Sequence, residues 1–437
     1  MKAIKFGGTS MSTVDSVNAV KKIILDDPER RYVVVSAPGK TADERKVTDM
    51  LISVYEASPE QRVKEFSVVS ARFERLAYGL GLPQNFFDED FNAITQALPS
   101  ADYDYIVSRG EYLCAKMLAA TLGFDFVDAA TLIKFRDNVY DDDYTETVCK
   151  IGLKKHKRAV IPGFYGSDQN GRVVAFSRGG SDISGAIIAR AVNASLYENF
   201  TDVDGFMTCD PRIVPHASVI DILTYKELRE LAYMGANVLH PESIFPVRKA
   251  NIPIHILNTF NRNAQGTKIV PTEDFLKGKY ERRKKMPITA IAGRKDFYAL
   301  YIDKSMMNSE IGFIRNALSC FERFDIPVEH IPSGIDSMTV VFSAVADDVA
   351  NDLISAVKKA VNPDHISLTK DVALIAIVGH GMRSRPGTAA RAISRLSNAE
   401  INLRMIDQGA SEINIILGVS NDDFERALVA LNGEFEI

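Results

Sequence analysis

Two short stretches of the sequence place a cation directly beside paired glycines: KFGGTS at residues 5–10 and FSRGGSD at residues 176–182. Glycine lets backbone N–H groups approach an anion closely, and a helix that follows adds a favourable dipole. Lys5 brings a mobile positive charge to the first stretch, and Arg178 brings a guanidinium that can fork onto a carboxylate or a phosphate. The pattern predicts a site for phosphate and carboxylate groups.

Each stretch also has a simpler interpretation. Two glycines after a strand are often only a tight turn, and Ser181 and Asp182 could be plain helix caps. A third stretch, TDVDGFMTCDPR at 201–212, could likewise consist of turns. Three such loops after strands of one parallel sheet are harder to dismiss, because the carboxyl ends of those strands form the ligand crevice. Neither GxxxxGK[ST] nor GxGxxG occurs, which excludes a Walker loop and a Rossmann dinucleotide site.

The elements that must position these loops alternate between strands and helices up to about residue 260. Short β-branched runs occur at 32–37, 124–129, 158–164 and 252–258. Between the first two runs lies a helical pattern with one apolar face, formed by Val47, Met50, Leu51, Val54 and Tyr55. Near-continuous apolar strands separated by such helices predict an α/β fold with a mostly parallel sheet covered on both faces.

Residues 288–437 contain an internal repeat. At an offset of 75 residues, 312–348 aligns without gaps to 387–423, and the apolar helix faces coincide. Each copy reads as strand, turn, helix, strand, strand, helix, which predicts two small α+β modules. The strand at 288–294 belongs to neither copy, which leaves open whether the modules are interleaved. The basic cluster at 282–285 before the repeat is expected to be a solvated linker.

The composition fits a globular protein of two or three domains, at 437 residues with 46% hydrophobic content. No apolar run approaches the roughly 18 residues of a membrane span. The four cysteines are isolated, and the N-terminal segment passes into a strand instead of a secretory signal, so we expect a cytoplasmic protein. The formal net charge of -5 argues against nucleic acid as the main partner.

Taken together, these stretches resemble the aspartokinases of the amino acid kinase family. The motifs that carry the resemblance are KFGGTS (5–10), KVTDML (46–51), SRGE (108–111), FSRGGSD (176–182), TDVDGF with DPR (201–212), GANVLHP (235–241) and QGASEINI (408–415). The resemblance implies a three-layer α/β kinase domain over 1–275. It also implies two ferredoxin-like ACT modules, at 288–365 and 370–437.

The implied activity is transfer of a phosphoryl group from MgATP to the side-chain carboxylate of L-aspartate. That carboxylate is already ionised at neutral pH, so no general base is needed, and the task is neutralisation and in-line positioning. The resemblance assigns catalysis to Lys5 and Asp182. It assigns substrate binding to Thr48, Glu111, Arg178 and Ser181. It assigns nucleotide binding to Lys5, Gly7, Gly8, Gly179, Gly180, Thr201, Asp202, Asp210 and Arg212, and Mg²⁺ is expected to arrive with ATP.

Some alternatives remain at this point. Glu111 could be a surface glutamate at the start of a helix, where it would favour the dipole. Asn237 and Met207 stand where many relatives carry a lysine and a tyrosine attributed to nucleotide contact. The competing functions are another kinase of the same family, acting on glutamate, acetylglutamate or uridylate, and a catalytically weak amino acid sensor.

Paired ACT-type modules also imply regulation by an end-product amino acid, with lysine favoured and threonine as the alternative. They imply a homodimer or a dimer of dimers. By resemblance, the effector-binding residues are Met306, Ser309, Phe313, Val328 and Glu329, and the glutamate suits an ammonium. Met306 and Met307 could instead fill the core, a role for which methionine is well suited.

Overall fold

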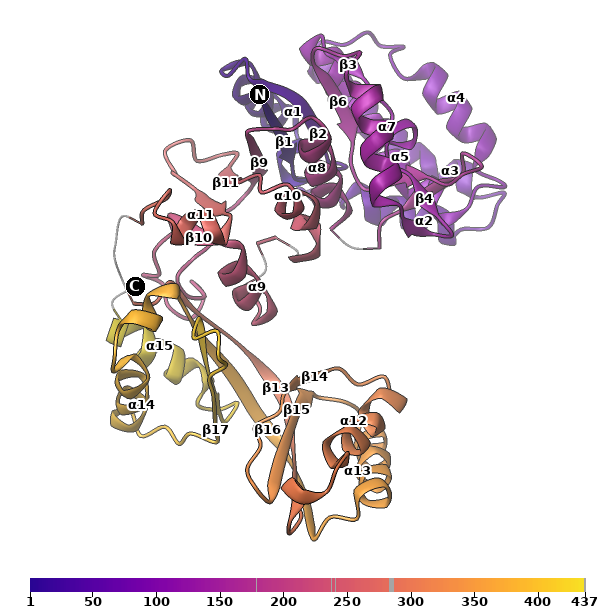
Figure 1. Ribbon diagram of the computed structural model, residues 1–437. Coiled ribbons are helices and arrows are strands. Elements are labelled where there is room, and N and C mark those ends of the chain that lie inside the picture. The colour runs from indigo at the N-terminus through magenta and orange to yellow at the C-terminus, as the bar shows by residue number, and fades with distance from the viewer. Residues whose placement is uncertain (178, 237, 240, 283–286, 436–437) are drawn as a thin grey trace. The chain divides into compact units, whose positions relative to one another are not determined.

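The computed structural model describes residues 1–177, 179–236, 238–239, 241–282 and 287–435 (Figure 1). The chain divides into two compact units. Unit 1 contains Met1–Phe206, Val219–Leu228 and Asn237–Arg283, and unit 2 contains Met207–Ser218, Arg229–Ala236 and Lys284–Ile437. The chain therefore contributes two short segments to unit 2 before its whole C-terminal part joins that unit. No helix in the described ranges is long and apolar enough to cross a membrane.

Unit 1 is built on a mostly parallel eight-stranded sheet. In spatial order its strands are β10 (Ile222–Thr224), β12 (Thr267–Val270), β11 (Ile254–Asn258), β9 (Leu196–Thr201), β1 (Lys2–Phe6), β2 (Arg30–Val35), β6 (Ala159–Pro162) and β3 (Asp125–Phe126). Among these, the pair β11 and β12 is antiparallel. Two small hairpins lie outside the sheet: β4 (Phe135–Arg136) with β5 (Val139–Tyr140), and β7 (Tyr165–Ser167) with β8 (Val173–Ala175). The predicted α/β class is confirmed.

Helices cover both faces of this sheet. One face packs on α1 (Val14–Leu25), α2 (Val47–Glu56), α3 (Arg62–Gly79) and α5 (Tyr103–Leu122) in a single apolar cluster. The other face packs on α8 (Gly180–Ala191), which is covered in turn by α7 (Asp142–Leu153) and α10 (Phe245–Lys249). Because side chains alternate along a strand, Ile4 and Phe6 enter the first cluster while Lys5 faces the α8 side.

The remaining helical elements of unit 1 are short or peripheral. They are η1 (Thr9–Met11), α4 (Asp88–Ala97), α6 (Ala129–Leu132), η2 (Pro241–Ile244) and α11 (Thr272–Leu276), while α9 (Tyr225–Tyr233) begins in unit 1 and ends in unit 2. Local chemistry explains the boundaries: Thr13 and Ser16 form a reciprocal capping box at the start of α1. Gly123, at φ 66°, ends α5 in the left-handed conformation.

Unit 2 contains one six-stranded antiparallel sheet. Its order is β14 (Val328–His330), β15 (Ser337–Ser343), β13 (Ala290–Asp303), β16 (His365–Val378), β18 (Asn414–Val419) and β17 (Met405–Asp407). The other elements are η3 (Met307–Ser309), α12 (Phe313–Arg323), α13 (Asp347–Val361), η4 (His380–Ser384), α14 (Thr388–Asn398) and α15 (Phe424–Phe435). The two long strands β13 and β16 are the central pair of the sheet.

Two apolar cores divide this sheet into halves. In the first module, α12 and α13 pack on β15 and on the later part of β13. In the second module, α14 and α15 pack on β18 and on the later part of β16. Side chains from 207–218 complete the second core: Cys209, Val214 and Ala217 belong to the same buried cluster. The segment 229–236 is also tied to this unit, since Glu230 accepts a hydrogen bond from Asn414 Nδ2 at 2.6 Å.

Three sequence-based expectations need correction. The strand expected by itself at 288–294 is the first part of β13, which continues to Asp303. The register of β13 shifts between Arg294 and Phe297, and its start pairs with 374–378. Arg282, expected in a solvated linker, is 11% exposed and pairs with the fully buried Glu227, while 283–285 lie outside the described residues. Tyr55 is 37% exposed and is thus the exposed member of the apolar face of α2, whose other members are buried or half-buried.

Candidate active site

A buried lysine and an aspartate meet at the carboxyl edge of the central strands. Lys5 Nζ lies 2.7 Å from Asp182 Oδ1, although 176 residues separate them in the chain. Asn199 Nδ2 donates to the same carboxylate oxygen at 2.9 Å, and Tyr197 donates its hydroxyl to the backbone carbonyl of Asp182 at 3.2 Å. The structure thus brings together the two residues to which the resemblance assigned catalysis, and two residues of β9 hold the aspartate.

Asn199 was not among the sequence candidates. It lies on β9 directly opposite Lys5 in the parallel register with β1, so the two side chains share a face of the sheet. The register is the signal that could have identified it, because neighbours on one face of a sheet are close enough to act on a common partner.

The start of α8 excludes helix capping as the role of Asp182. The N-cap is Gly179, at φ 58°, which has no side chain with which to cap the helix. Asp182 stands in the first turn, where a negative charge favours the dipole, but its carboxylate turns to Lys5 and Asn199. Ser181 is half-buried, and a Cβ on Gly163 would come within 2.7 Å of its side chain. Arg178 lies outside the described residues.

The two glycines after β1 have different surroundings. Gly7 donates its N–H to the carbonyl of Phe200 at 3.1 Å, and a Cβ on it would lie 3.7 Å from Lys5 Nζ. A Cβ on Gly8 would lie 2.9 Å from the carbonyl oxygen of Ala37. Gly39 donates its N–H to the Gly8 carbonyl at 2.8 Å. Gly7 therefore leaves space beside the ammonium, and Gly8 permits close contact with the loop after β2.

Glu111 carries a buried carboxyl group with a raised pKa. It lies in the middle of α5 and is only 4% exposed, so the interpretation as a surface residue at a helix start is wrong. Burial raises the pKa of its carboxyl to about 7, while the N–H of Ala37 and the charges of Lys46 and Arg109 act in the opposite direction. Its Oε2 has no hydrogen-bond partner among the described residues. A buried carboxylate oxygen without a partner is suited to a ligand donor, such as an ammonium.

The residues at the end of β9 and just after it form hydrogen bonds with the glycine turn. Thr9 donates its hydroxyl to Asp202 Oδ2 at 3.0 Å, and Thr201 donates to Asp202 Oδ1 at 3.2 Å. Ser10 and Thr259 share a buried hydrogen bond of 2.7 Å between their hydroxyl oxygens. Thr201 and Asp202 thus lie beside the KFGGTS turn, as their assignment to one site requires.

Other candidates are placed differently. Asp210 and Arg212 belong to the 207–218 segment of unit 2, where Arg212 Nη2 donates to Asp210 Oδ2 at 2.7 Å and its side chain is 88% exposed. Met207 packs against the second core of that unit, and Asn237 lies outside the described residues. Thr48 is half-buried in the first turn of α2. Among the described residues, no three His, Cys, Asp or Glu side chains gather to hold a metal ion.

Comparison with known proteins decides the family. The amino acid kinase family model matches residues 1–258, and an ACT domain model matches residues 375–435. Aspartokinase 3 of Bacillus subtilis is 36% identical over 458 residues, which cover 100% of this chain and 98% of that protein. The chain belongs to the aspartokinases.

Solved structures agree with this assignment. The aspartate kinase of Clostridium acetobutylicum superposes on this aspartokinase with a TM-score of 0.90 at 41% identity, covering 100% of both chains. Aspartokinase III of Escherichia coli, crystallised with aspartate and ADP, shares the fold with a TM-score of 0.76 at 24% identity and full coverage of both chains. The expected amino acid kinase domain and ACT modules are therefore confirmed, and the enzyme is a kinase.

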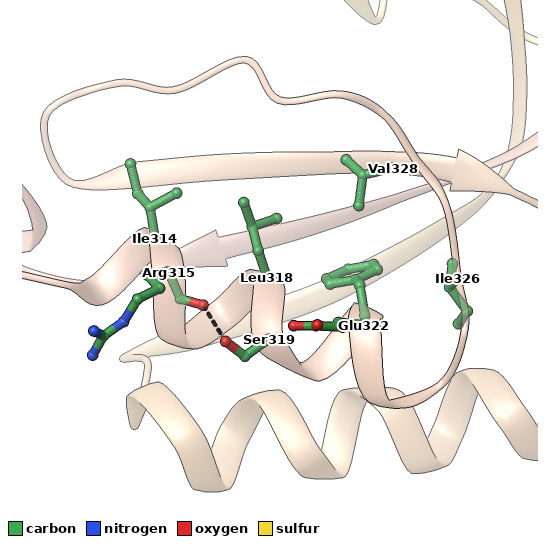
Figure 2. A pocket seen from close by; sticks show the side chains of 8 residues that line it. Ile314, Arg315, Leu318, Ser319, Glu322, Ile326 and Val328 are labelled. Atoms are coloured by element: carbon green, nitrogen blue, oxygen red, sulfur yellow. Dashed lines mark hydrogen bonds between the residues drawn. The ribbon is translucent and has the colours of Figure 1, made fainter. Parts of the chain in front are cut away.

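In the first ACT module of this aspartokinase, a shallow groove runs between α12 and β14. Figure 2 shows Ile314 and Leu318 of α12 on one side of it and Val328 of β14 on the other. The apolar face of α12 borders this groove and is therefore only partly buried: Ile314 is 44% exposed, whereas Phe321 packs in the module core.

The five effector candidates are spread over this module. Phe313 is buried in the module core, and Val328 is one of the partly buried residues that pack against that core. Met306 and Ser309 are exposed in the turn before α12, so the core-filling interpretation fails for Met306 but holds for Met307, which is buried. Glu329 has a half-buried carboxylate that accepts hydrogen bonds from the hydroxyls of Tyr233 and Ser343. Burial raises the pKa of Glu329.

Proposed function

We propose that this aspartokinase transfers the γ-phosphoryl group of ATP to the side-chain carboxylate of L-aspartate and forms 4-phospho-L-aspartate. This reaction would be the first step towards lysine, threonine and methionine. The observation that carries the proposal is the Lys5–Asp182 pair beside the open glycine turn, because phosphoryl transfer depends on fixed positive charge at the transferring group.

In this proposal Lys5 stabilises charge on the phosphoryl group, and Asp182 and Asn199 hold Lys5 in place. The attacking oxygen and the triphosphate are both negative, so the main barrier is their repulsion and not removal of a proton. Lys5 is only 8% exposed, which strengthens its interaction with an anion relative to the same charge in water.

Aspartate would bind by its charged groups at the reacting end of the site. Glu111 takes the α-ammonium on its free carboxylate oxygen, and Arg178 takes the α-carboxylate. Thr48 and Ser181 complete the substrate contacts. Discrimination against glutamate depends on one methylene, which a closed site can exclude by roughly 10- to 200-fold.

The glycine turn fits the phosphates of ATP. A Cβ on Gly7 would fill the space beside the Lys5 ammonium, so the glycine keeps room for a phosphate oxygen there. The proposed nucleotide contacts come from the two glycine pairs and the loops after β9: Gly7, Gly8, Gly179, Gly180, Thr201, Asp202, Asp210 and Arg212. Mg²⁺ would enter bound to ATP, where it offsets the charge of the phosphates.

The catalytic proposal is tested by trapping the acyl phosphate with hydroxylamine. Wild-type enzyme with MgATP should give hydroxamate from L-aspartate and much less from L-glutamate. Lys5→Ala should lower kcat by about 100- to 1,000-fold, the usual size of losing one such stabilising group. Lys64→Ala, which removes an exposed lysine of α3, is the matched control and should retain wild-type rates. Hydroxamate from glutamate alone would contradict the proposal, and none from either acceptor would favour the sensor.

We further propose that the ACT modules are interleaved through β13 and bind lysine as a feedback inhibitor, in a homodimer or dimer of dimers. The aspartate kinase of Clostridium acetobutylicum is an allosteric enzyme, which supports regulation in this relative. A lysine ammonium would bind at Glu329 and compete with the hydroxyl of Tyr233 for its carboxylate. The effector can shift activity only by binding the two states of the enzyme differently.

Glu329→Gln tests the effector proposal. Removal of a charged hydrogen-bond partner costs about 1.5–3 kcal/mol, so half-inhibition should require about 10- to 100-fold more lysine, with uninhibited activity retained. Glu322→Gln is the control, because Glu322 is an exposed glutamate of the same module that lines the groove beside α12 and is not bound to Tyr233 or Ser343. Unchanged inhibition in Glu329→Gln, or a loss that follows Glu322→Gln instead, would refute this effector site.

A further inference from the structure

One buried arginine of unit 1 has no role in the proposed chemistry. Arg72 lies on α3 and is 1% exposed. Its Nη2 donates to the carbonyls of Gly39 at 2.7 Å and Ser12 at 3.3 Å, and its Nη1 donates to the carbonyl of Arg45. Its Nε lies 3.0 Å from Glu44 Oε2. A fully desolvated guanidinium is expensive to bury, and this one binds mainly backbone carbonyls of two loops.

These acceptors belong to two segments that border the candidate active site. Ser12 ends the turn that begins with KFGGTS. Gly39, Glu44 and Arg45 lie in the loop at 36–46, between β2 and α2. Arg72 therefore joins the glycine turn to the next loop along the same sheet edge.

The 36–46 loop contacts both Glu111 and Gly8 of the candidate active site. At its start, the N–H of Ala37 binds the Glu111 carboxylate. Two residues later, Gly39 packs on Gly8, where a Cβ on Gly39 would come within 2.7 Å of the Gly8 carbonyl carbon. The position of this loop consequently sets how far the phosphate-binding turn lies from the buried carboxylate.

We propose that Arg72 is a positioning residue for phosphoryl transfer, which holds the 36–46 loop against the glycine turn and so fixes Glu111 relative to Gly8. The inference rests on the proposed function only in that Glu111 binds the aspartate ammonium. A lysine cannot replace this arginine, because one ammonium cannot reach carbonyls of both segments as the planar fork does. Without the fork, the carbonyls of Gly39, Ser12 and Arg45 lose their donor, and the loop moves to find others.

The test compares Arg72→Ala with Arg75→Ala. Arg75 also pairs with Glu44, but its side chain is 62% exposed, so it controls for loss of a charge on the same helix. Displacement by about 1 Å can lower a rate about 100-fold, so Arg72→Ala should lose about that factor in kcat/KM for aspartate. The KM for ATP should change less, and Arg75→Ala should stay within about twofold of wild type.

Chemical rescue separates positioning from a general loss of structure. Free guanidinium at millimolar concentration should restore aspartate turnover to Arg72→Ala by about tenfold or more, and have no effect on wild type or Arg75→Ala. A misfolded protein gains nothing from the ion. If Arg72→Ala does not fold, Arg72→Lys takes its place, since it keeps the charge and most of the volume but lacks the fork.

Wild-type kinetic constants in a folded Arg72→Ala or Arg72→Lys would overturn the proposal. Equal losses for aspartate and ATP without rescue would do the same. Either result leaves the proposed function intact as long as wild-type enzyme yields aspartyl hydroxamate. Absence of that product from wild type would instead refute the proposed function itself.

Discussion

The buried carboxyl of Glu111 makes the stability of the empty enzyme depend on pH in a defined way. Burial raises its pKa from 4.5 to about 7. Between these values the folded protein keeps a proton that the unfolded chain has lost, so the free energy of unfolding falls by about 1.4 kcal/mol per pH unit. A shift of about 2.5 units therefore removes about 3 kcal/mol of stability by pH 8 relative to pH 4.5.

Glu111→Gln removes this titration. Its advantage over wild type in free energy of unfolding should grow by about 3 kcal/mol from pH 4.5 to pH 8, in the absence of substrates. Since 1 kcal/mol shifts Tm by roughly 2–4 °C in a domain of this size, the gap in Tm should widen by roughly 6–12 °C. Thermal unfolding of both proteins at half-unit pH steps measures it. Glu65→Gln, which changes an exposed glutamate of α3, is the control and should show a flat difference.

A difference between Glu111→Gln and wild type that stays constant within about 1 kcal/mol over this range would refute the reasoning. So would a gap that narrows as the pH rises, because that sign belongs to a carboxyl whose folded-state pKa is lowered. Substrate binding gives an independent check: if the ionised form takes the ammonium, the KM for aspartate should rise about tenfold per unit below pH 7 in wild type.

Two further outcomes follow from the glycine turn and its lysine. Asp182→Asn should lower kcat by about 100-fold with little change in the KM for aspartate, both measured at saturating ATP. The reason is that the amide cannot hold Lys5 as the carboxylate does at 2.7 Å. A rise in the KM for aspartate without a fall in kcat would contradict that role of Asp182. Gly8→Ala places a Cβ 2.9 Å from the Ala37 carbonyl and should lower the free energy of unfolding by about 1–3 kcal/mol in urea titration. Gly409→Ala, with open space around it, should be neutral, and equal stability of the two variants would contradict the packing argument.

The parts of the site that sit on strand ends were predictable from the sequence. The carboxyl ends of parallel strands share one edge, so the KFGGTS and FSRGGSD loops were expected to border one crevice. The pairing of Asp182 with Lys5 was implied by the resemblance to the aspartokinases. In the structure, Lys5 Nζ and Asp182 Oδ1 lie 2.7 Å apart. The burial of Glu111 was harder to predict from the sequence. The helix α5 begins at Tyr103, well before the SRGE motif, and its N-cap Asp102 is the sequence signal that places Glu111 in mid-helix.

Other features depend on tertiary contacts that leave no local pattern. Arg72 stands in an amphipathic helix in which arginine ordinarily faces water, and its burial follows from carbonyls in loops without periodicity. The internal repeat likewise predicts the spacing of only some of the equivalent elements in the two modules. α12 and α14 lie 75 residues apart, as the gapless alignment requires, but β14 and β17 lie 77 apart, because the connections in the two modules differ. Loop lengths are less constrained than the packed helices they follow.

The membership of 207–218 and 229–236 in unit 2 has a consequence for how this chain can be divided. Both segments lie within the stretch that matches the amino acid kinase family, yet Cys209, Val214 and Ala217 fill the core of the second ACT module. A fragment that starts at residue 288 would lack part of its own interior, and a fragment that ends near 275 would carry those apolar side chains without their partners. The kinase and ACT sequences therefore cannot be separated by a single cut. Any such cut would leave a cavity in the ACT fragment and exposed apolar side chains, prone to association, on the kinase fragment.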